Sequence, residues 1–146
     1  MNNEKIVNIL AINHDGTIIK IVPENYNLNI QVEIQYLANM INEKYTIMNY
    51  KLLEYSKFVF IDIYKNNKIY TDIDEIAKTE LSIGYTRYEN NNIIIDVFSS
   101  DCPYGQIHLM ANDIIIYDQN DIEIDYEQMI KMSEEYWNNF SKNNIK

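Results

Sequence analysis

Short runs of alternating apolar and polar residues, separated by polar turn residues, recur along most of this chain and constrain its fold more than any other feature. Successive side chains of a β-strand point to opposite faces of a sheet, so such alternation predicts half-buried strands. One run covers residues 57–64, stops at Asn66 and Asn67, and resumes over residues 68–71. The pattern therefore predicts strands that pair as antiparallel hairpins.

Hairpins are expected at four places along the chain. The first pairs residues 5–13 with 16–22 around His14-Asp15-Gly16, because Asp-Gly between two β-branched runs is a strong hairpin signal. The other expected pairs are 57–64 with 68–71, 81–88 with 93–98, and 106–110 with 114–118. The segment 46–55 shows no clear pattern.

Other segments have the spacing of helices. Apolar residues of segment 30–44 recur at helical intervals, and Asp72 with Glu75 makes a capping box ahead of a short helix over 73–79. The clearest helix is 126–142, which follows a second capping box and carries a stripe of Tyr126, Met129, Ile130, Ser133, Tyr136, Trp137 and Phe140. Helices segregated from paired strands indicate the α+β class.

Length and composition predict one domain, residues 1–146. The chain has 146 residues, of which 47% are hydrophobic, and this fits a single core. No apolar run approaches the roughly 20 residues of a membrane span, so a soluble protein is expected. Residues 1–5 lack the features of a secretory signal, which predicts a cytoplasmic protein or one secreted without a classical signal peptide.

Charge restricts the class of partner. Twelve basic residues stand against 22 acidic ones, giving a net charge of −10, and Arg87 is the single arginine. Binding to nucleic acid depends on cations that neutralise phosphates, so nucleic acid is excluded as the expected partner. An acidic surface instead suits a basic protein, or imitates the phosphates of DNA as an inhibitor.

No catalytic signature is present, and no enzymatic activity, cofactor or metal is expected. Three glycines are too few and too far apart for a phosphate-binding loop. The candidates for catalysis or metal binding are His14 with Asp15, His108, and Cys102 in the loop 99–108. Neither histidine has a recognisable metal-ligand spacing, and the adjacent Asp101 is expected to raise the pKa of the Cys102 thiol.

Aromatic residues supply the candidate binding surfaces. Tyrosines suit protein interfaces, and the expected partner-binding set on strands is Tyr64, Tyr70, Tyr85, Tyr88 and Tyr117. On the last helix, an apolar face forms either a groove or part of the core, and it consists of Tyr126, Met129, Ile130, Trp137 and Phe140.

The order of these elements resembles one known family. The match includes His14-Asp15-Gly16, the segment 22–26, the repeated hairpins, the loop 101–105 and the helix 126–140. Together these resemble the OrfX family encoded in clostridial neurotoxin gene clusters, at the size of its smallest members. The resemblance implies a TULIP-like (tubular lipid-binding) fold, in which a curved antiparallel sheet packs on the long C-terminal helix and on one helix in the N-terminal half.

The same resemblance implies a non-enzymatic accessory protein that binds a larger OrfX-type partner and makes weak contact with membrane lipids. Net charge opposes the lipid contact, because anionic headgroups usually need clustered bases. An alternative from another class is an acidic immunity or inhibitor protein that neutralises a basic toxin or nuclease. A third is an enzyme or small-molecule binder that uses the loop 99–108 with Cys102 as its nucleophile.

Overall fold

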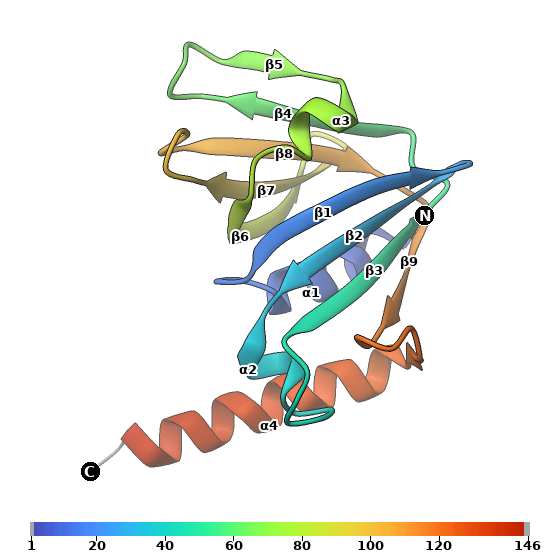
Figure 1. The fold of residues 1–146 in the computed structure, drawn as a ribbon, viewed down its shortest axis with the longest axis vertical. Coiled ribbons are helices and arrows are strands. Elements are labelled where there is room, and N and C mark those ends of the chain that lie inside the picture. The colour runs from blue at the N-terminus through green and yellow to red at the C-terminus, as the bar shows by residue number, and fades with distance from the viewer. Residues whose placement is uncertain (1, 145–146) are drawn as a thin grey trace.

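A curved antiparallel sheet with a long C-terminal helix forms the body of the protein and confirms the α+β class (Figure 1). The computed structural model describes residues 2–144. Its ten strands follow the order β10-β9-β3-β2-β1-β6-β7-β8-β4-β5, and all pairings are antiparallel. Because the first and last strands of this order do not pair with each other, the sheet stays open.

The helices and strands have the following bounds. The helices are α1 (Asn3–Ile12), α2 (Gln35–Ala38), α3 (Ile73–Ile76) and α4 (Tyr126–Asn144). The strands are β1 (Thr17–Glu24), β2 (Asn27–Glu33), β3 (Ile47–Leu53), β4 (Lys57–Asp62), β5 (Lys68–Tyr70), β6 (Leu81–Glu89), β7 (Asn92–Phe98), β8 (Gly105–Met110), β9 (Asp113–Tyr117) and β10 (Glu123–Ile124).

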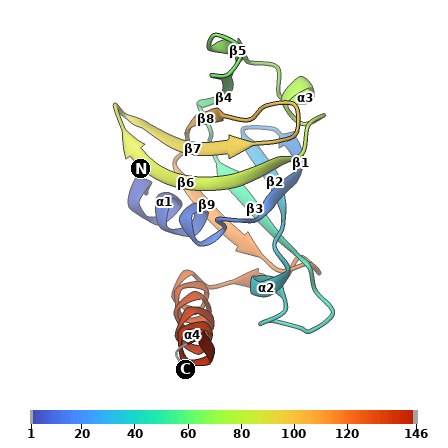
Figure 2. The ribbon, with the colours of Figure 1, turned by 90° about the vertical axis from the view of Figure 1, so that its left-hand side faces the viewer.

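The first element is a helix, so the strand expected over residues 5–13 is wrong. Ile6, Ile9 and Leu10 are buried, and their spacing places them on one side of α1. This side packs against β6 and β9, where α1 lies inside the bend of the sheet (Figure 2). Burial of the helical face decides the conformation of this segment. Strand β1, which was expected to pair with residues 5–13, pairs with β2.

The helix expected over residues 30–44 is also wrong, because the segment begins as strand β2. Leu28, Ile30 and Val32 alternate with polar residues and are buried, which is the period of a strand between two neighbours. Only the short helix α2 follows, and it buries Leu37 and Ala38. The helix of the N-terminal half that packs in the sheet is therefore α1.

Two of the expected hairpins are confirmed, β4 with β5 and β6 with β7. The strands expected over 106–110 and 114–118 exist as β8 and β9, but they do not pair with each other. Strand β8 pairs with β4 and β7, whereas β9 pairs with β3 and β10. The short helix α3 and the long helix α4 are confirmed, and segment 46–55 forms β3.

Asparagine makes the tight turns of this glycine-poor chain. The β6–β7 turn consists of Asn90 and Asn91, with φ of 52° and 65°. Asn66 and Asn67 have the same left-handed conformation in the β4–β5 connection, as does Asn25 between β1 and β2. Among non-glycine residues, asparagine accepts this conformation at little cost.

A buried hydrogen-bonded pair fixes the end of α1 to the sheet. Asn13 is fully buried, and its Nδ2 atom donates to the Ile9 carbonyl at 2.7 Å. The Tyr50 hydroxyl of β3 donates to Asn13 Oδ1 at 2.7 Å. Three residues later, a Cβ atom on Gly16 would lie only 2.8 Å from Val32 Cγ1. Glycine is therefore needed directly before β1, because there is no room for a side chain at this position.

Replacing Tyr50 with Phe tests this pair. The change leaves the buried Asn13 Oδ1 atom without its donor, and we expect the free energy of unfolding to fall by about 1–3 kcal/mol in urea denaturation. Tyr26 is 81% exposed and serves as the control. The Tyr26→Phe variant should stay within about 0.5 kcal/mol of the parent protein, and an equal loss in both variants would contradict the role given to Tyr50.

Candidate functional site

The two histidines lie on separate elements. His14 lies in the connection between α1 and β1, not at a hairpin tip, and its ring stacks on Trp137 with centroids 5.3 Å apart. Its Nδ1 atom is 3.3 Å from Asp15 Oδ2. His108 lies on β8, where burial and two nearby cations lower its pKa. Across residues 2–144, no three His, Cys, Asp or Glu side chains gather in a way that could hold a metal ion.

Cys102 is buried beside a carboxylate in the loop between β7 and β8. Burial, together with the Asp62 carboxylate, raises the pKa of the Cys102 thiol from 9.0 to about 11. The acidic neighbour is thus Asp62 and not Asp101, because β4 pairs with β8 and its last residue reaches this loop. A protonated, buried thiol is a poor nucleophile, so the geometry does not activate Cys102 for covalent chemistry.

The expected partner-binding tyrosines do not form one surface. Tyr64 and Tyr70 belong to the β4–β5 hairpin at one edge of the sheet, whereas Tyr117 lies on β9 near the other edge. Tyr85 and Tyr88 lie on β6 between these edges and are exposed. Tyr70 is half-buried and stacks on Phe60 of β4, with ring centroids 5.5 Å apart.

The apolar face expected on the last helix is divided between core and surface. Near the start of α4, Met129 is fully buried, Ile130 is half-buried, and the Tyr126 hydroxyl accepts a hydrogen bond from Asn8 Nδ2 of α1 at 3.0 Å. Further along, Trp137 is half-buried and Phe140 is 47% exposed. The first part of this face therefore packs in the core, and the second part lines a groove.

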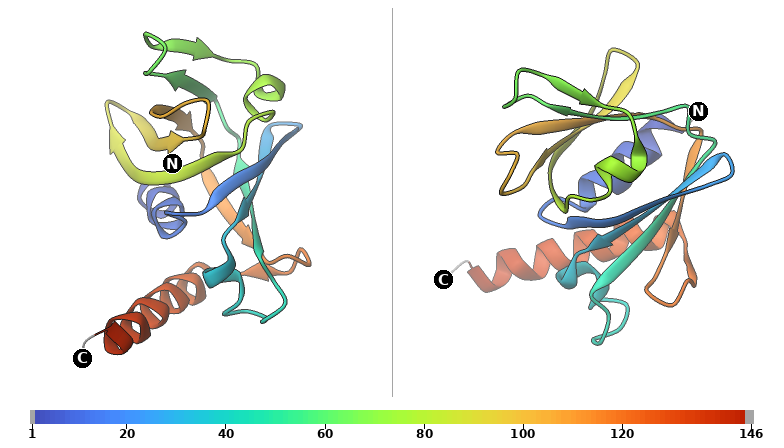
Figure 3. Two further views of the ribbon diagram at one scale, coloured as in Figure 1. Left: turned by 60° about the vertical axis from the view of Figure 1, so that its left-hand side comes forward. Right: turned by 45° about the horizontal axis from the view of Figure 1, so that its top comes forward.

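Helix α4 runs past α2 and away from the sheet (Figure 3). Residues of both helices line the aromatic groove, an open hollow of about 870 Å³. Its aromatic wall consists of Tyr36, Tyr136, Trp137 and Phe140, and its acidic residues are Asp15 and Glu33. The remaining lining residues are uncharged: Thr17, Ile34, Gln35, Asn39 and Thr46. The volume falls within the range of ligand-binding clefts.

The aromatic rings of the groove pack against one another. Tyr36 and Tyr136 stack with centroids 4.6 Å apart, and Trp137 meets Tyr136 at 5.1 Å and an interplanar angle of 70°. The Tyr36 hydroxyl lies 3.1 Å from the Ile12 carbonyl and donates to it. Burial, with the negative charge of Asp15, raises the pKa of Tyr36 to about 12. The wall is therefore a fixed part of the fold.

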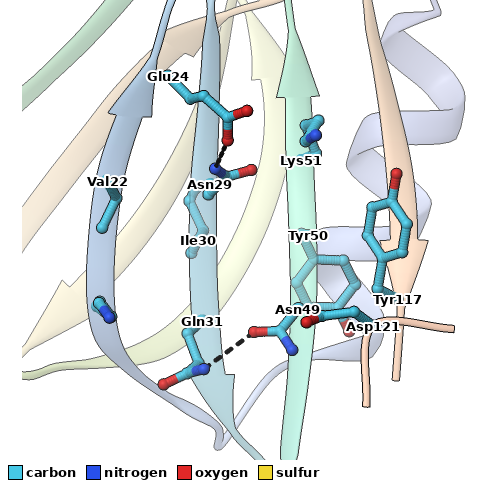
Figure 4. Close-up of a pocket in the computed structure, with 11 residues that line it drawn as sticks. Val22, Glu24, Asn29, Ile30, Gln31, Asn49, Tyr50, Lys51, Tyr117 and Asp121 are labelled. Carbon is cyan, nitrogen blue, oxygen red and sulfur yellow. Dashed lines mark hydrogen bonds between the residues drawn. The ribbon is translucent and has the colours of Figure 1, made fainter. Parts of the chain in front are cut away.

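A second hollow, of about 440 Å³, lies on the outer face of β1, β2, β3 and β9 (Figure 4). Its amide side chains are already hydrogen-bonded within the chain. Asn29 Nδ2 donates to Glu24 Oε2 at 2.7 Å, and Gln31 Nε2 donates to Asn49 Oδ1 at 3.0 Å. Asn49 Nδ2 in turn donates to the Asp118 carbonyl at 3.1 Å. Because these polar groups satisfy one another, we take the aromatic groove as the candidate site.

Sequence patterns indicated only part of this groove. Tyr136, Trp137 and Phe140 belong to the expected stripe of α4, and the sequence points to Asp15 only as a partner of His14. Tyr36 and Glu33 fall within the segment that the sequence predicts as a helix, although Glu33 ends β2 and Tyr36 lies on α2. The alternation of apolar and polar residues from Leu28 to Ile34 is the sequence signal for a strand here, and it would have predicted that Glu33 lies at the end of a strand and that Tyr36 follows it.

Comparison with protein families, with curated proteins and with solved structures finds no match to this chain. The resemblance to the OrfX family therefore stays a prediction. None of the helices described between residues 2 and 144 combines the length and the apolar composition needed to cross a membrane.

Alkylation of Cys102 tests the state of its thiol. With the pKa raised to about 11, the thiol remains protonated at pH 8, and we expect iodoacetamide to react with the native protein at least about tenfold more slowly than with the urea-unfolded protein. Mass spectrometry of timed samples measures both rates. Equal rates would contradict the burial and the raised pKa of the thiol, and a faster reaction of the native protein would show the activated thiol that the loop-enzyme alternative requires.

Tyr36 predicts a loss of stability at alkaline pH. Its pKa is about 12 in the folded chain against 10.0 for an unperturbed tyrosine, so the folded state holds this proton more tightly. The stabilisation that Tyr36 adds to the free energy of unfolding is complete below pH 10 and is lost as pH rises towards 12. Between these values, urea unfolding of Tyr36→Phe should show a shallower decline with pH than the parent protein. A slope unchanged by Tyr36→Phe would contradict the shift, and Tyr26→Phe is the matched control.

Proposed function

We propose that this chain is a non-enzymatic binding protein that associates with, and neutralises, a positively charged partner protein. Its net charge of −10 carries the proposal, together with a groove whose only charged lining residues are acidic. Complementary charge accelerates encounter with a basic protein and disfavours other acidic proteins. This is the behaviour of an immunity or inhibitor protein directed at a basic toxin or nuclease.

Most of the acidic charge is not neutralised within the fold. In the described part of the chain, the carboxylates paired with lysine or arginine are Asp113, with Lys5, and Glu89 and Asp96, both with Arg87. Among the remaining carboxylates, Asp15 faces His14, and Glu24 and Glu54 accept hydrogen bonds from asparagine side chains, which leaves their charge in place. Surface pairs add little stability in any case, so folding does not account for this surplus of acid.

An acidic corner lies where β10 leads into α4. It consists of the exposed residues Asp121, Glu123, Asp125 and Glu127. Among them, Ile122 leaves 62% of its surface exposed. An exposed aliphatic side chain with acidic neighbours in the sequence suits an interface that combines apolar and charged contacts. The acidic corner lies at the start of α4, and residues further along α4 line the aromatic groove, so one partner can extend along this helix.

A second candidate function is an accessory subunit that packs on a larger OrfX-type protein. The outward aromatic residues of the β6–β7 hairpin favour it, because Tyr85 is 66% exposed and Phe98 is 44% exposed. Binding through such residues depends on apolar burial and is insensitive to salt. Salt dependence therefore distinguishes the accessory subunit from the neutralising protein.

Capture of the partner from lysate and culture fluid of the source organism tests the proposal. At 0.05 M salt, we expect the tagged protein to retain a small basic protein, which is released at about 0.5 M salt because screening removes long-range attraction. Mass spectrometry identifies the bound protein, and the purified partner is then assayed for an activity that this chain inhibits. A large partner that stays bound at high salt would favour the accessory subunit and overturn the charge-driven proposal.

Matched charge variants extend this test to the acidic corner. We expect the triple change Asp121→Asn, Glu123→Gln and Glu127→Gln to lower the association rate constant with the purified partner about tenfold in stopped-flow or biosensor measurements. The control triple removes the same charge around α3, with Asp74→Asn, Glu75→Gln and Glu80→Gln. Equal effects of the two triples would show that total charge, and not the corner, governs association.

A further inference from the structure

We infer that the aromatic groove receives the guanidinium group of an arginine side chain from the positively charged partner. The inference rests on the proposed function, because it names the part of the partner that the groove takes. Three properties of the groove carry it: accessible ring surface, carboxylates beside the rings, and the lack of a basic side chain among the lining residues.

The ring arrangement provides surfaces against which a planar cation can lie. Tyr136 and Trp137 meet at 70°, and Trp137 meets Phe140 at 74° with centroids 5.5 Å apart. Tyr136, Trp137 and Phe140 therefore meet at steep angles, whereas Tyr36 stacks on Tyr136 and the His14 ring stacks on one face of Trp137. Trp137 is half-buried and Phe140 is 47% exposed, so part of the ring surface remains open to solvent. Cations bind ring faces through the ring quadrupole, and tryptophan is the strongest such ring.

Two carboxylates, Asp15 and Glu33, line the same groove as the rings. The Asp15 side chain is 78% exposed, and its backbone N–H donates to the Ile83 carbonyl of β6 at 2.9 Å, which anchors the residue beside the groove. Glu33, at the end of β2, is exposed on the same groove. Asp15 Oδ2 faces His14 Nδ1 at 3.3 Å, and Glu33 takes part in none of the ion pairs found within residues 2–144. A cation in the groove would compensate Glu33 and add to the pairing of Asp15, so the groove favours a cation.

Arginine fits this combination better than lysine. Its planar guanidinium stacks on aromatic rings and donates two parallel hydrogen bonds to a carboxylate, whereas the lysine ammonium is a compact and strongly hydrated charge. The groove volume of about 870 Å³ exceeds the space that one side chain needs, so it also admits the backbone that carries the arginine. An arginine-bearing segment of a protein is thus the occupant.

Trp137 provides a direct measurement, because it is the only tryptophan of the chain and lies in the groove. The probe is a blocked hexa-arginine peptide, titrated into the full chain at 0.15 M salt with excitation selective for tryptophan. We expect a saturable change in Trp137 emission. A blocked hexa-lysine peptide of equal charge should bind about threefold or more weakly.

Matched variants separate binding in the groove from general attraction to an acidic protein. The double variant Asp15→Asn, Glu33→Gln should raise the dissociation constant for hexa-arginine about tenfold. Asparagine accepts the left-handed backbone of Asp15, whose φ is 70°, so the variant keeps the local fold. The control double Glu75→Gln, Glu80→Gln removes equal charge near α3 and should change the constant less than twofold. The Phe140→Ala variant, which removes one ring, should weaken binding several-fold.

Several results would overturn the inference. These are unchanged Trp137 emission, equal weakening by the groove and control doubles, or equal affinity for hexa-arginine and hexa-lysine. The natural partner separates this failure from failure of the proposed function. If the groove double binds a captured basic partner as tightly as the parent protein does, the inference fails and the function stands. If hexa-arginine binds the groove but no basic protein is captured, the neutralising function fails and the site remains.

Discussion

Burial of α1 in the bend of the sheet is the constraint on which the rest of this structure depends. A ten-stranded open sheet has an inner face that must be covered, and α1 covers its centre with Ile6, Ile9 and Leu10. The helix ends at a fully buried asparagine, Asn13, which is hydrogen-bonded to Tyr50 of β3. A polar group without a partner at this depth is costly, so this pair fixes where α1 ends and where β1 begins.

Strand alternation and turn chemistry predicted the local pairs of the fold, but could not predict its long-range pairs. The hairpins around Asn66-Asn67 and Asn90-Asn91 followed from residues adjacent in sequence, as did the long helix α4. By contrast, β9 pairs with β3, which precedes it by some 60 residues, as Leu52 opposite Ile114 shows. Segment 5–13 forms a helix because burial in the tertiary structure outweighs the strand preference of its β-branched residues. Local sequence patterns do not report this burial.

The candidate site was predictable only where it lies on α4. Periodicity placed Trp137 and Phe140 on one face with Met129, but it could not show that this face leaves the core partway along the helix. That division depends on where α1 and α2 contact α4, which is a property of the tertiary structure. Tyr36 completes the groove from a segment expected as a longer helix, so an error in secondary structure concealed a site residue.

The residues that form the groove also connect α1, α2 and α4, and these contacts affect the entropy cost of binding a partner in the groove. The Tyr36 hydroxyl donates to the Ile12 carbonyl at the end of α1, while the Tyr36 ring stacks on Tyr136 of α4. Trp137 stacks on His14, which follows α1 directly. The aromatic wall is thus held by contacts within the chain, which lowers the conformational entropy that binding costs. An arginine entering such a groove gains its ring contacts without rearranging the sheet, because the packing of α1 has already set them in place.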